Sequence, residues 1–243
     1  MTTQIPESQF SGAIPTLNGR GFMLEALASF AEEFVASAAA NDGEALDMGC
    51  AYGVATLAAL NAGARVCACD MEQLHLDVLA DKTPDALKPN LRMVAGSLPD
   101  VSFPPGAFQT ILASRVIHFL SGDDVKKTLA AMYTWLEPGG RLFLVADTPY
   151  MPGWSEIVPA YEKAKAGGAP WPGFIPDFER FSSSAKSATG GPKFMNTLDP
   201  DILERECRAA GFDVDRASYF GLQRLGDESN GREHCGCAAR KPV

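Results

Sequence analysis

The sequence predicts an α/β domain in which a mostly parallel sheet is covered by helices on both faces. Three observations indicate this class. The apolar strand 44–48 runs into a turn with two glycines and then into a helix, and a second strand, 65–70, ends in an acid. Strand-like and helix-like segments then alternate along the chain, as they do where helices connect parallel strands.

Each element is justified by its own pattern of apolar, capping and turn residues. The expected strands are 44–48, 65–70, 91–95, 108–113 and 141–146, followed by 212–220 and 234–240, which we expect to form a hairpin through 226–231. The expected helices are 23–39, 54–60, one beginning at Met71, one from the Ser121 cap to Leu136, and one from Asp199 to Ala210.

The turn after the first of these strands is the most informative segment. Gly49 and Gly53 can adopt backbone angles closed to other residues and admit a ligand at close range, and Asp47 is the acid of the preceding strand. Ala51 stands between the two glycines, which disfavours a dinucleotide site because a pyrophosphate needs glycine there. The pattern predicts a site for a nucleotide-like ligand; the alternative is an ordinary tight turn.

Asp70 ends the second strand, 23 positions after Asp47. This is close to the ~20-residue separation expected of a carboxylate that binds a ribose diol. We therefore expect Asp70 to accept hydrogen bonds from both ribose hydroxyls, with Met71 against the adenine face. The alternative is that Asp70 only caps the helix that follows.

Composition limits the partners and the setting. The chain has 243 residues, 46% of them hydrophobic, with 21 basic and 30 acidic side chains and a net charge of −9. It is long enough for one full core, and the charge disfavours long nucleic acid as a substrate. No apolar run reaches the ~18 residues of a membrane span, and the N-terminus does not resemble a secretion signal. We expect a cytoplasmic monomer or homodimer.

The six cysteines include two Cys-x-Cys pairs, Cys67/Cys69 and Cys235/Cys237. Both pairs lie in strand-like runs, and the usual zinc spacing is wider. We therefore expect buried thiols and no metal site.

The series Asp47, Gly49, Gly53 resembles the first motif of the class I S-adenosylmethionine-dependent methyltransferases, with Ala51 in place of the middle glycine. Residues 136–140 (LEPGG), 209–212 (AAGF) and 239–242 (ARKP) also look like that family. The resemblance covers roughly 40–147 and 197–243. It implies a Rossmann-like, seven-stranded, mostly parallel sheet with an antiparallel last strand, and S-adenosylmethionine as the cofactor.

The resemblance further implies one methyltransferase domain over 1–243. Its parts would be an N-terminal lid and helix (1–40), a cofactor-binding core (41–147), an inserted substrate-binding cap (148–197) and the C-terminal part of the core (198–243). The cap is rich in proline, glycine and aromatic residues, which would wall a pocket for a flat or apolar molecule.

The residues expected to bind the cofactor follow the ends of the strands: Asp47, Gly49, Cys50, Ala51, Gly53, Asp70, Met71, Ser97, Leu98 and Ser114. Ser97 stands where the family commonly has an aspartate facing the adenine. The alternative for Ser97 is a turn residue before Pro99.

Candidate catalytic and substrate-binding residues lie after the fourth strand and in the two outer segments. His118 is a candidate general base, with packing as its alternative, and Tyr150 is expected beside the methyl acceptor. His75 and His234 show no pattern that suggests a role. The expected substrate-binding residues are Arg20, Arg115, Tyr150, Trp154, Trp171 and Phe174.

The resemblance therefore implies methyl transfer to a small, apolar or aromatic metabolite, with nitrogen or oxygen favoured as the acceptor. In-line displacement on a sulfonium methyl needs alignment and exclusion of water more than a nucleophilic residue. The alternatives are an NAD-dependent oxidoreductase and a protein that binds the cofactor without catalysis.

Overall fold

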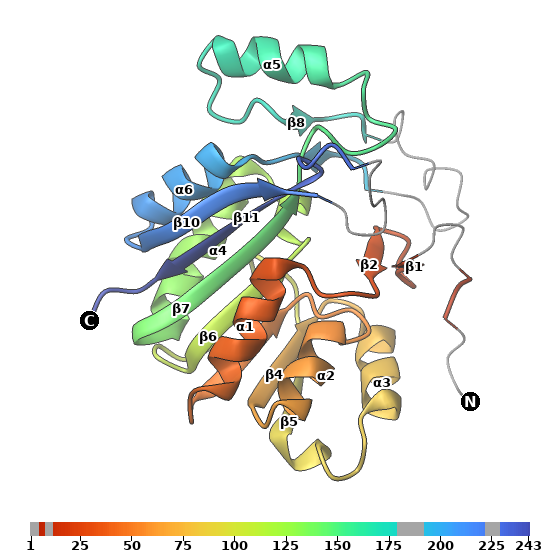
Figure 1. The fold of residues 1–243 in the computed structure, drawn as a ribbon, viewed down its shortest axis with the longest axis vertical. Helices are drawn as coiled ribbons and strands as arrows, with labels where there is room; N and C mark the ends of the chain where they lie inside the picture. The colour runs from red at the N-terminus through yellow and green to blue at the C-terminus, as the bar shows by residue number, and fades with distance from the viewer. Residues whose placement is uncertain (1–4, 8–11, 179–191, 222–228) are drawn as a thin grey trace.

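A computed structural model describes residues 5–7, 12–178, 192–221 and 229–243. A seven-stranded sheet of order β10-β11-β7-β6-β3-β4-β5 runs through its centre (Figure 1). Five neighbouring strands are parallel: β3 (Glu44–Met48), β4 (Arg65–Asp70), β5 (Leu91–Ala95), β6 (Phe108–Ser114) and β7 (Leu136–Asp147). The C-terminal strand β11 (His234–Arg240) pairs antiparallel with β7, and β10 (Asp213–Phe220) pairs antiparallel with β11. The expected fold class is confirmed.

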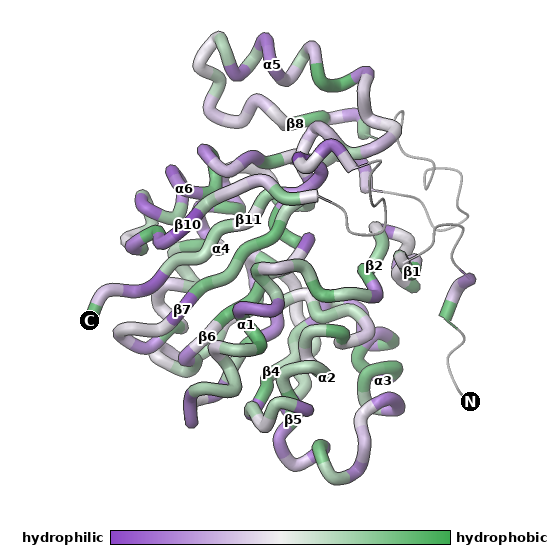
Figure 2. The backbone as a smooth tube through the Cα atoms, in the orientation of Figure 1, coloured by the Kyte–Doolittle hydropathy of each residue, from purple (hydrophilic) through white to green (hydrophobic). Residues whose placement is uncertain are grey.

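Helices cover both faces of this sheet. Alternate residues of β7 show it, because Leu142 and Leu144 pack in one apolar cluster and Phe143 and Val145 in another. The first cluster includes residues of α4 (Gly122–Trp135) and α6 (Pro200–Ala209), and the second those of α1 (Ser29–Ala39) and α2 (Val54–Asn61). α3 (Gln73–Lys82) packs on β4 and β5. Apolar residues line the central strands in Figure 2, as expected of strands buried on both faces.

Two predicted helix starts are confirmed by their caps. The Ser121 hydroxyl accepts a hydrogen bond from the Asp124 N–H at the start of α4, and the Asp199 carboxylate accepts one from the Ile202 N–H at the start of α6. Each cap satisfies a backbone donor that the helix leaves unpaired. α3 differs, since its cap is Glu72 and not Asp70.

The prediction of a helix over 23–39 was wrong in its first part. Residues Phe22–Leu24 form strand β2, which pairs antiparallel with β1 (Ala13–Pro15), and α1 begins only at Ser29. The backbone groups of residues 22–24 pair with β1, so they cannot form the backbone hydrogen bonds of a helix, whatever the spacing of the side chains. The fifth predicted strand, 141–146, is longer than expected, because β7 starts at Leu136.

The inserted segment lies over one end of the sheet (Figure 1). It contains α5 (Val158–Ala166) and a short antiparallel pair, β8 (Phe174–Ile175) and β9 (Met195–Asn196). Two 3-10 turns, η1 (Lys88–Asn90) and η2 (Ile117–Phe119), complete the elements of the described chain. Within the described ranges, no helix is both long and apolar enough to cross a membrane.

Candidate cofactor and methyl-acceptor site

The carboxyl ends of β3, β4 and β6 meet beside a cavity of about 390 Å³. β3 lies between β4 and β6, so the chain's crossovers diverge to opposite sides there, and ligands of open α/β sheets bind at this position. Most residues expected to bind the cofactor line the cavity: Asp47, Gly49, Cys50, Ala51, Asp70, Met71, Ser97, Leu98 and Ser114. Arg20, Arg115 and His118 line it too, whereas Gly53 does not.

The glycines of this turn leave space for neighbouring side chains of the protein itself as well as for a ligand. Gly49 and Gly53 have φ of +74° and +80°. A Cβ at Gly49 would lie 2.2 Å from Val116 Cγ2, and one at Gly53 would lie 2.3 Å from Leu79 Cδ1. Both positions therefore require glycine for conformation and for packing. Ala51 adopts φ of +45° with a side chain present.

Asp70 ties this turn to the start of α3. Its Oδ2 accepts a hydrogen bond from the Ala51 N–H (2.8 Å) and its Oδ1 accepts one from the Glu72 N–H (2.9 Å). The carboxylate is buried yet lines the cavity. It is thus held in place by backbone donors on both sides, at the end of β4 where a ribose-binding acid was expected.

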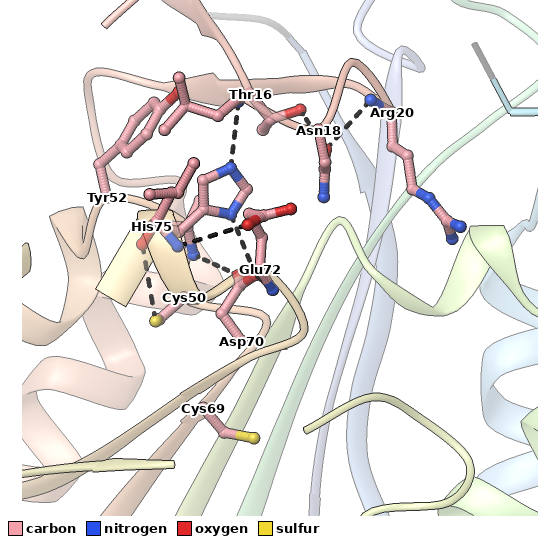
Figure 3. A network of polar contacts seen from close by, with 12 residues as sticks. Thr16, Asn18, Arg20, Cys50, Tyr52, Cys69, Asp70, Glu72 and His75 are labelled. Carbon is pink, nitrogen blue, oxygen red and sulfur yellow. Dashed lines mark hydrogen bonds and ion pairs between the residues drawn. The ribbon is translucent and has the colours of Figure 1, made fainter. Parts of the chain in front are cut away.

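His75, to which the sequence assigned no role, is the third partner of Asp70. Its Nδ1 lies 3.0 Å from Asp70 Oδ1, and its Nε2 accepts a hydrogen bond from the Leu17 N–H at 3.1 Å (Figure 3). Leu17 belongs to the turn between β1 and β2, 58 residues away in sequence. Because the contact depends on the position of the hairpin, no local pattern could have revealed it.

Asp47 lies under the turn in a buried position. The Thr56 hydroxyl donates to its Oδ2 (2.6 Å), and burial raises the pKa of Asp47 to about 6 although that hydrogen bond opposes the rise. Burial also raises the pKa of the Cys50 thiol well above its usual range, so Cys50 is a neutral wall of the cavity and not a nucleophile.

A buried charged cluster forms the opposite wall. Arg115, in the left-handed region with φ of +59°, makes two hydrogen bonds to the Asp147 carboxylate (2.8 and 3.0 Å) and one to the Phe22 carbonyl (2.6 Å). Burial alone would raise the pKa of Asp147, but Arg115 and the nearby His118 hold that pKa well below its usual range. Arg115 thus already has partners, which speaks against its predicted part in binding substrate.

Two histidines flank Asp147. His118 is fully buried, its Nδ1 accepts a hydrogen bond from the Asp147 N–H (3.0 Å), and its Nε2 has no hydrogen-bond partner among the described residues. Burial lowers the pKa of His118 to about 4, so the ring is neutral and carries its proton on Nε2. This state makes His118 a hydrogen-bond donor and disfavours the predicted role of general base.

His234 lies on the other side of the carboxylate. Its Nδ1 is 3.0 Å from Asp147 Oδ1, and neither ring nitrogen has a well-aligned hydrogen bond within the described ranges. A second cavity, of about 600 Å³, adjoins this ring and the segment 24–29. The two cavities share Leu24 and Ala26–Ala28 as walls.

The aromatic residues of the inserted segment do not line the first cavity. Tyr150 donates a hydrogen bond to Glu162, and Arg232 lies 3.6 Å from the centre of its ring. The other three predicted residues are also packed within or beside the cap: Trp154 on Phe178, Phe174 on Phe194, and Trp171 under Arg205. None of these four residues lines the first cavity, and each packs against a neighbouring side chain of the cap or beside it.

Residues that the sequence did not single out complete the cavity. They come from the β1–β2 hairpin and from η2: Thr16, Asn18, Phe22, Met23, Leu24, Val116, Phe119 and Leu120. All six cysteines are buried free thiols, and no cluster suited to a metal occurs among the residues described.

The strand order, the glycine turn after β3 and the carboxylate at the end of β4 are typical of α/β proteins that bind a nucleotide-like ligand. Comparisons with known proteins agree. Residues 45–140 match the family model described as "Methyltransferase domain". A cypemycin N-terminal methyltransferase from Streptomyces sp is 35% identical over 106 residues, which are 43% of this chain and 42% of that relative.

Solved structures show the same fold. An S-adenosylmethionine-dependent methyltransferase from Mesorhizobium loti aligns with a TM-score of 0.63 at 15% identity, over 87% of this chain and 95% of the other. A 1,6-didemethyltoxoflavin-N1-methyltransferase from Burkholderia thailandensis, solved with 1,6-didemethyltoxoflavin and S-adenosylhomocysteine bound, aligns with a TM-score of 0.60 at 19% identity, over 88% and 79%. Residues 45–140 are thus similar to methyltransferase domains, and the chain has the fold of S-adenosylmethionine-dependent methyltransferases. It spans less than half of the curated relative's length.

Proposed function

We propose that this protein transfers the methyl group of S-adenosylmethionine to a small apolar or aromatic metabolite, with nitrogen favoured over oxygen as the acceptor. The observation that carries the proposal is the cavity at the carboxyl ends of β3, β4 and β6, with the Asp70 carboxylate on its wall. The names of two relatives, an N-terminal methyltransferase and an N1-methyltransferase, support nitrogen. We retain a single domain over 1–243 as part of this proposal.

The residues of the cavity suit the cofactor's chemical groups. Asp70 would accept a hydrogen bond from a ribose hydroxyl on Oδ2, and Met71, which is 47% exposed, would lie against the adenine with Leu98 and Ser97 near its edge. The methionine end would approach Gly49 and Ser114, where Asp47 would face its ammonium group. Arg20, whose side chain has no ion pair among the described residues, would meet its carboxylate.

The acceptor would lie at the other end of the same cavity. Phe22, Leu24, Phe119 and Leu120 line the cavity together with the buried His118 and would form that end. Apolar walls exclude water and align an apolar acceptor, which is the main requirement of an in-line displacement. We therefore place the acceptor against the hairpin and η2, and not against the aromatic residues of the cap.

Calorimetry and a transfer assay test the proposal. We expect the protein to bind S-adenosylmethionine and S-adenosylhomocysteine and not NAD, which would exclude the oxidoreductase. Incubation with methyl-labelled cofactor and a cell extract should label a small molecule. Binding without any labelled product would instead favour a protein that binds the cofactor without catalysis.

A further inference from the structure

The ring of His75 joins two parts of the cavity wall that are far apart in sequence. On one side it contacts Asp70 Oδ1, and on the other it accepts the hydrogen bond from the Leu17 N–H (Figure 3). The residue is 1% exposed, so neither contact competes freely with water. Among the described residues, no other side chain hydrogen-bonds both to Asp70 and to the β1–β2 hairpin.

These contacts fix the protonation of the ring. Nε2 must be the acceptor because its partner is a backbone N–H, so the proton of the neutral ring lies on Nδ1 and is donated to Asp70. Tyr52 packs edge-on against the ring, with 5.1 Å between centroids, and its hydroxyl donates to the Pro15 carbonyl (2.8 Å). The hairpin is thus attached on both sides of Thr16, at Pro15 and at Leu17.

The attached turn is braced by hydrogen bonds of its own. The Thr16 N–H donates to the Gly21 carbonyl (2.9 Å), and Asn18 Oδ1 accepts from the Thr16 hydroxyl (2.9 Å) and the Arg20 N–H (3.1 Å). Residues of this unit, including Thr16, Asn18 and Arg20, line the cavity. A ligand that fills the cavity therefore touches the hairpin and Asp70 together.

The hydrogen bonds that the Asp70 carboxylate already accepts determine which of its oxygens can accept another one from the ligand. Oδ1 is contacted by the Glu72 N–H and by His75, whereas Oδ2 is contacted only by the Ala51 N–H within the described part of the chain. A carboxylate offers about four acceptor positions, two on each oxygen. By occupying Oδ1, His75 holds the carboxylate in one orientation and leaves acceptor capacity on Oδ2.

We propose that His75 is a positioning residue that couples cofactor binding to the docking of the β1–β2 hairpin over the cavity. The inference rests on the proposed function, because it takes the ribose of S-adenosylmethionine as the ligand of Asp70. A docked hairpin holds Asp70 through His75 in its ribose-binding orientation. A bound cofactor in turn stabilises the docked hairpin, because binding couplings between two sites are reciprocal.

The experiment compares variants that keep or remove the bridge. His75→Phe keeps a ring beside Tyr52 and loses both polar contacts, and His75→Gln keeps one donor and one acceptor. Thr83→Val is the matched control, since it removes one buried hydrogen bond, to the Leu79 carbonyl (2.7 Å), at the far end of the same helix. Calorimetry gives the affinity for S-adenosylhomocysteine, and hydrogen exchange of peptides from 12–24 reports hairpin docking.

We expect S-adenosylhomocysteine to slow exchange over 12–24 in the unaltered protein. His75→Phe should weaken binding about five- to tenfold, as expected for one or two lost hydrogen bonds, and should abolish the slowing. His75→Gln should recover part of both effects, and Thr83→Val should change neither. His75→Asn, too short to bridge both partners, replaces His75→Phe if that variant does not fold.

Two results would overturn the inference: His75→Phe binds within twofold of the unaltered protein and still shows cofactor-dependent slowing, or Thr83→Val loses as much as His75→Phe. Failure of the unaltered protein to bind S-adenosylhomocysteine would refute the proposed function and the cofactor coupling together. The bridge to the hairpin would still be judged from the ligand-free protein, where His75→Phe should speed exchange over 12–24 and Thr83→Val should not.

Discussion

Asp47 and His118 are buried on the walls of the cavity, and the structure moves their pKa values in opposite directions. The pKa of Asp47 rises from 3.8 to about 6, and that of His118 falls from 6.5 to about 4, with burial as the largest cause of each shift. Each shift disfavours the charged form, so both side chains affect the free energy of unfolding over nearly the same pH range.

Asp47→Asn should stabilise the protein at neutral pH. A raised carboxyl pKa favours the folded state below pH 3.8, and this contribution is lost as the pH rises through about 6. A rise in pKa of this size corresponds to about 3 kcal/mol at most, and asparagine can still accept the Thr56 hydrogen bond. Urea unfolding should show a more stable variant at pH 7.5 and little difference at pH 4. A variant that is less stable at both pH values would contradict the prediction that burying the ionised Asp47 carboxylate lowers the free energy of unfolding.

His118→Asn should make the protein less sensitive to acid. A lowered histidine pKa gives stability that is complete above pH 6.5 and is lost as the pH falls through about 4, by up to about 3 kcal/mol. Asparagine retains an acceptor for the Asp147 N–H. The fall in unfolding free energy between pH 6.5 and 4 should be smaller in the variant. Both proteins contain Asp47, so its opposite contribution to the pH dependence of the unfolding free energy cancels in the comparison. An equal fall in the two proteins would show that the pKa of His118 is not lowered.

The glycine turn shows how one element combines conformation, packing and ligand contact. A side chain at Gly49 would clash with Val116, and one at Gly53 would clash with Leu79. Ala51 adopts the left-handed region with its side chain present, and its N–H donates a hydrogen bond to Asp70. A larger residue at Gly49 would therefore disturb the fold as well as the site, so loss of cofactor binding alone would not separate the two causes.

Ala51→Gly should not destabilise the protein and should raise its free energy of unfolding by up to about 1 kcal/mol. A non-glycine residue pays about 1–2 kcal/mol in the left-handed region, which offsets the greater flexibility of glycine in the unfolded chain. The backbone hydrogen bond to Asp70 is retained. Ala58→Gly in α2 is the control and should cost about 1 kcal/mol. Thermal and urea unfolding measure both; equal losses would mean that Ala51 is not strained.

At the scale of the whole molecule, the cap is attached to the core by aromatic and charged contacts away from the cavity. Tyr150 packs against Tyr161 of α5 and Tyr219 of β10, below the Arg232 guanidinium. These contacts connect the cap to β10 and to the segment that precedes β11. The cap therefore contributes to stability in a region separate from the wall that Asp70 and the hairpin form.

Tyr150→Ala should lower the melting temperature and leave the affinity for S-adenosylhomocysteine within about threefold, below ~1 kcal/mol. Its ring is lost from the junction of cap and core, and none of its contacts reaches the first cavity. Tyr133→Ala, which removes a tyrosine packed on Phe212 far from the cap, is the matched control. Methyl transfer that falls much more in Tyr150→Ala than in the control would instead support the prediction from sequence that Tyr150 lies beside the acceptor.

Local signals in the sequence determined the sheet and the cofactor end of the site. Short apolar runs, two capped helices and the series Asp47, Gly49, Gly53 act within a few residues, and the parallel strands bring Asp70 to the same edge of the sheet. Strand ends converge whenever the order of elements is known, which is why most residues expected to bind the cofactor line one cavity.

Tertiary structure alone decided the contacts that close the cavity. The hairpin over 13–24, the bridge from His75 to Leu17 and the charged cluster around Asp147 depend on how separate elements dock. The aromatic residues of the cap lie away from the first cavity for the same reason: composition shows that aromatic side chains need contacts, but only packing decides which neighbours they contact. Side-chain partners distant in sequence leave no periodic trace, because their spacing is set by the path of the folded chain.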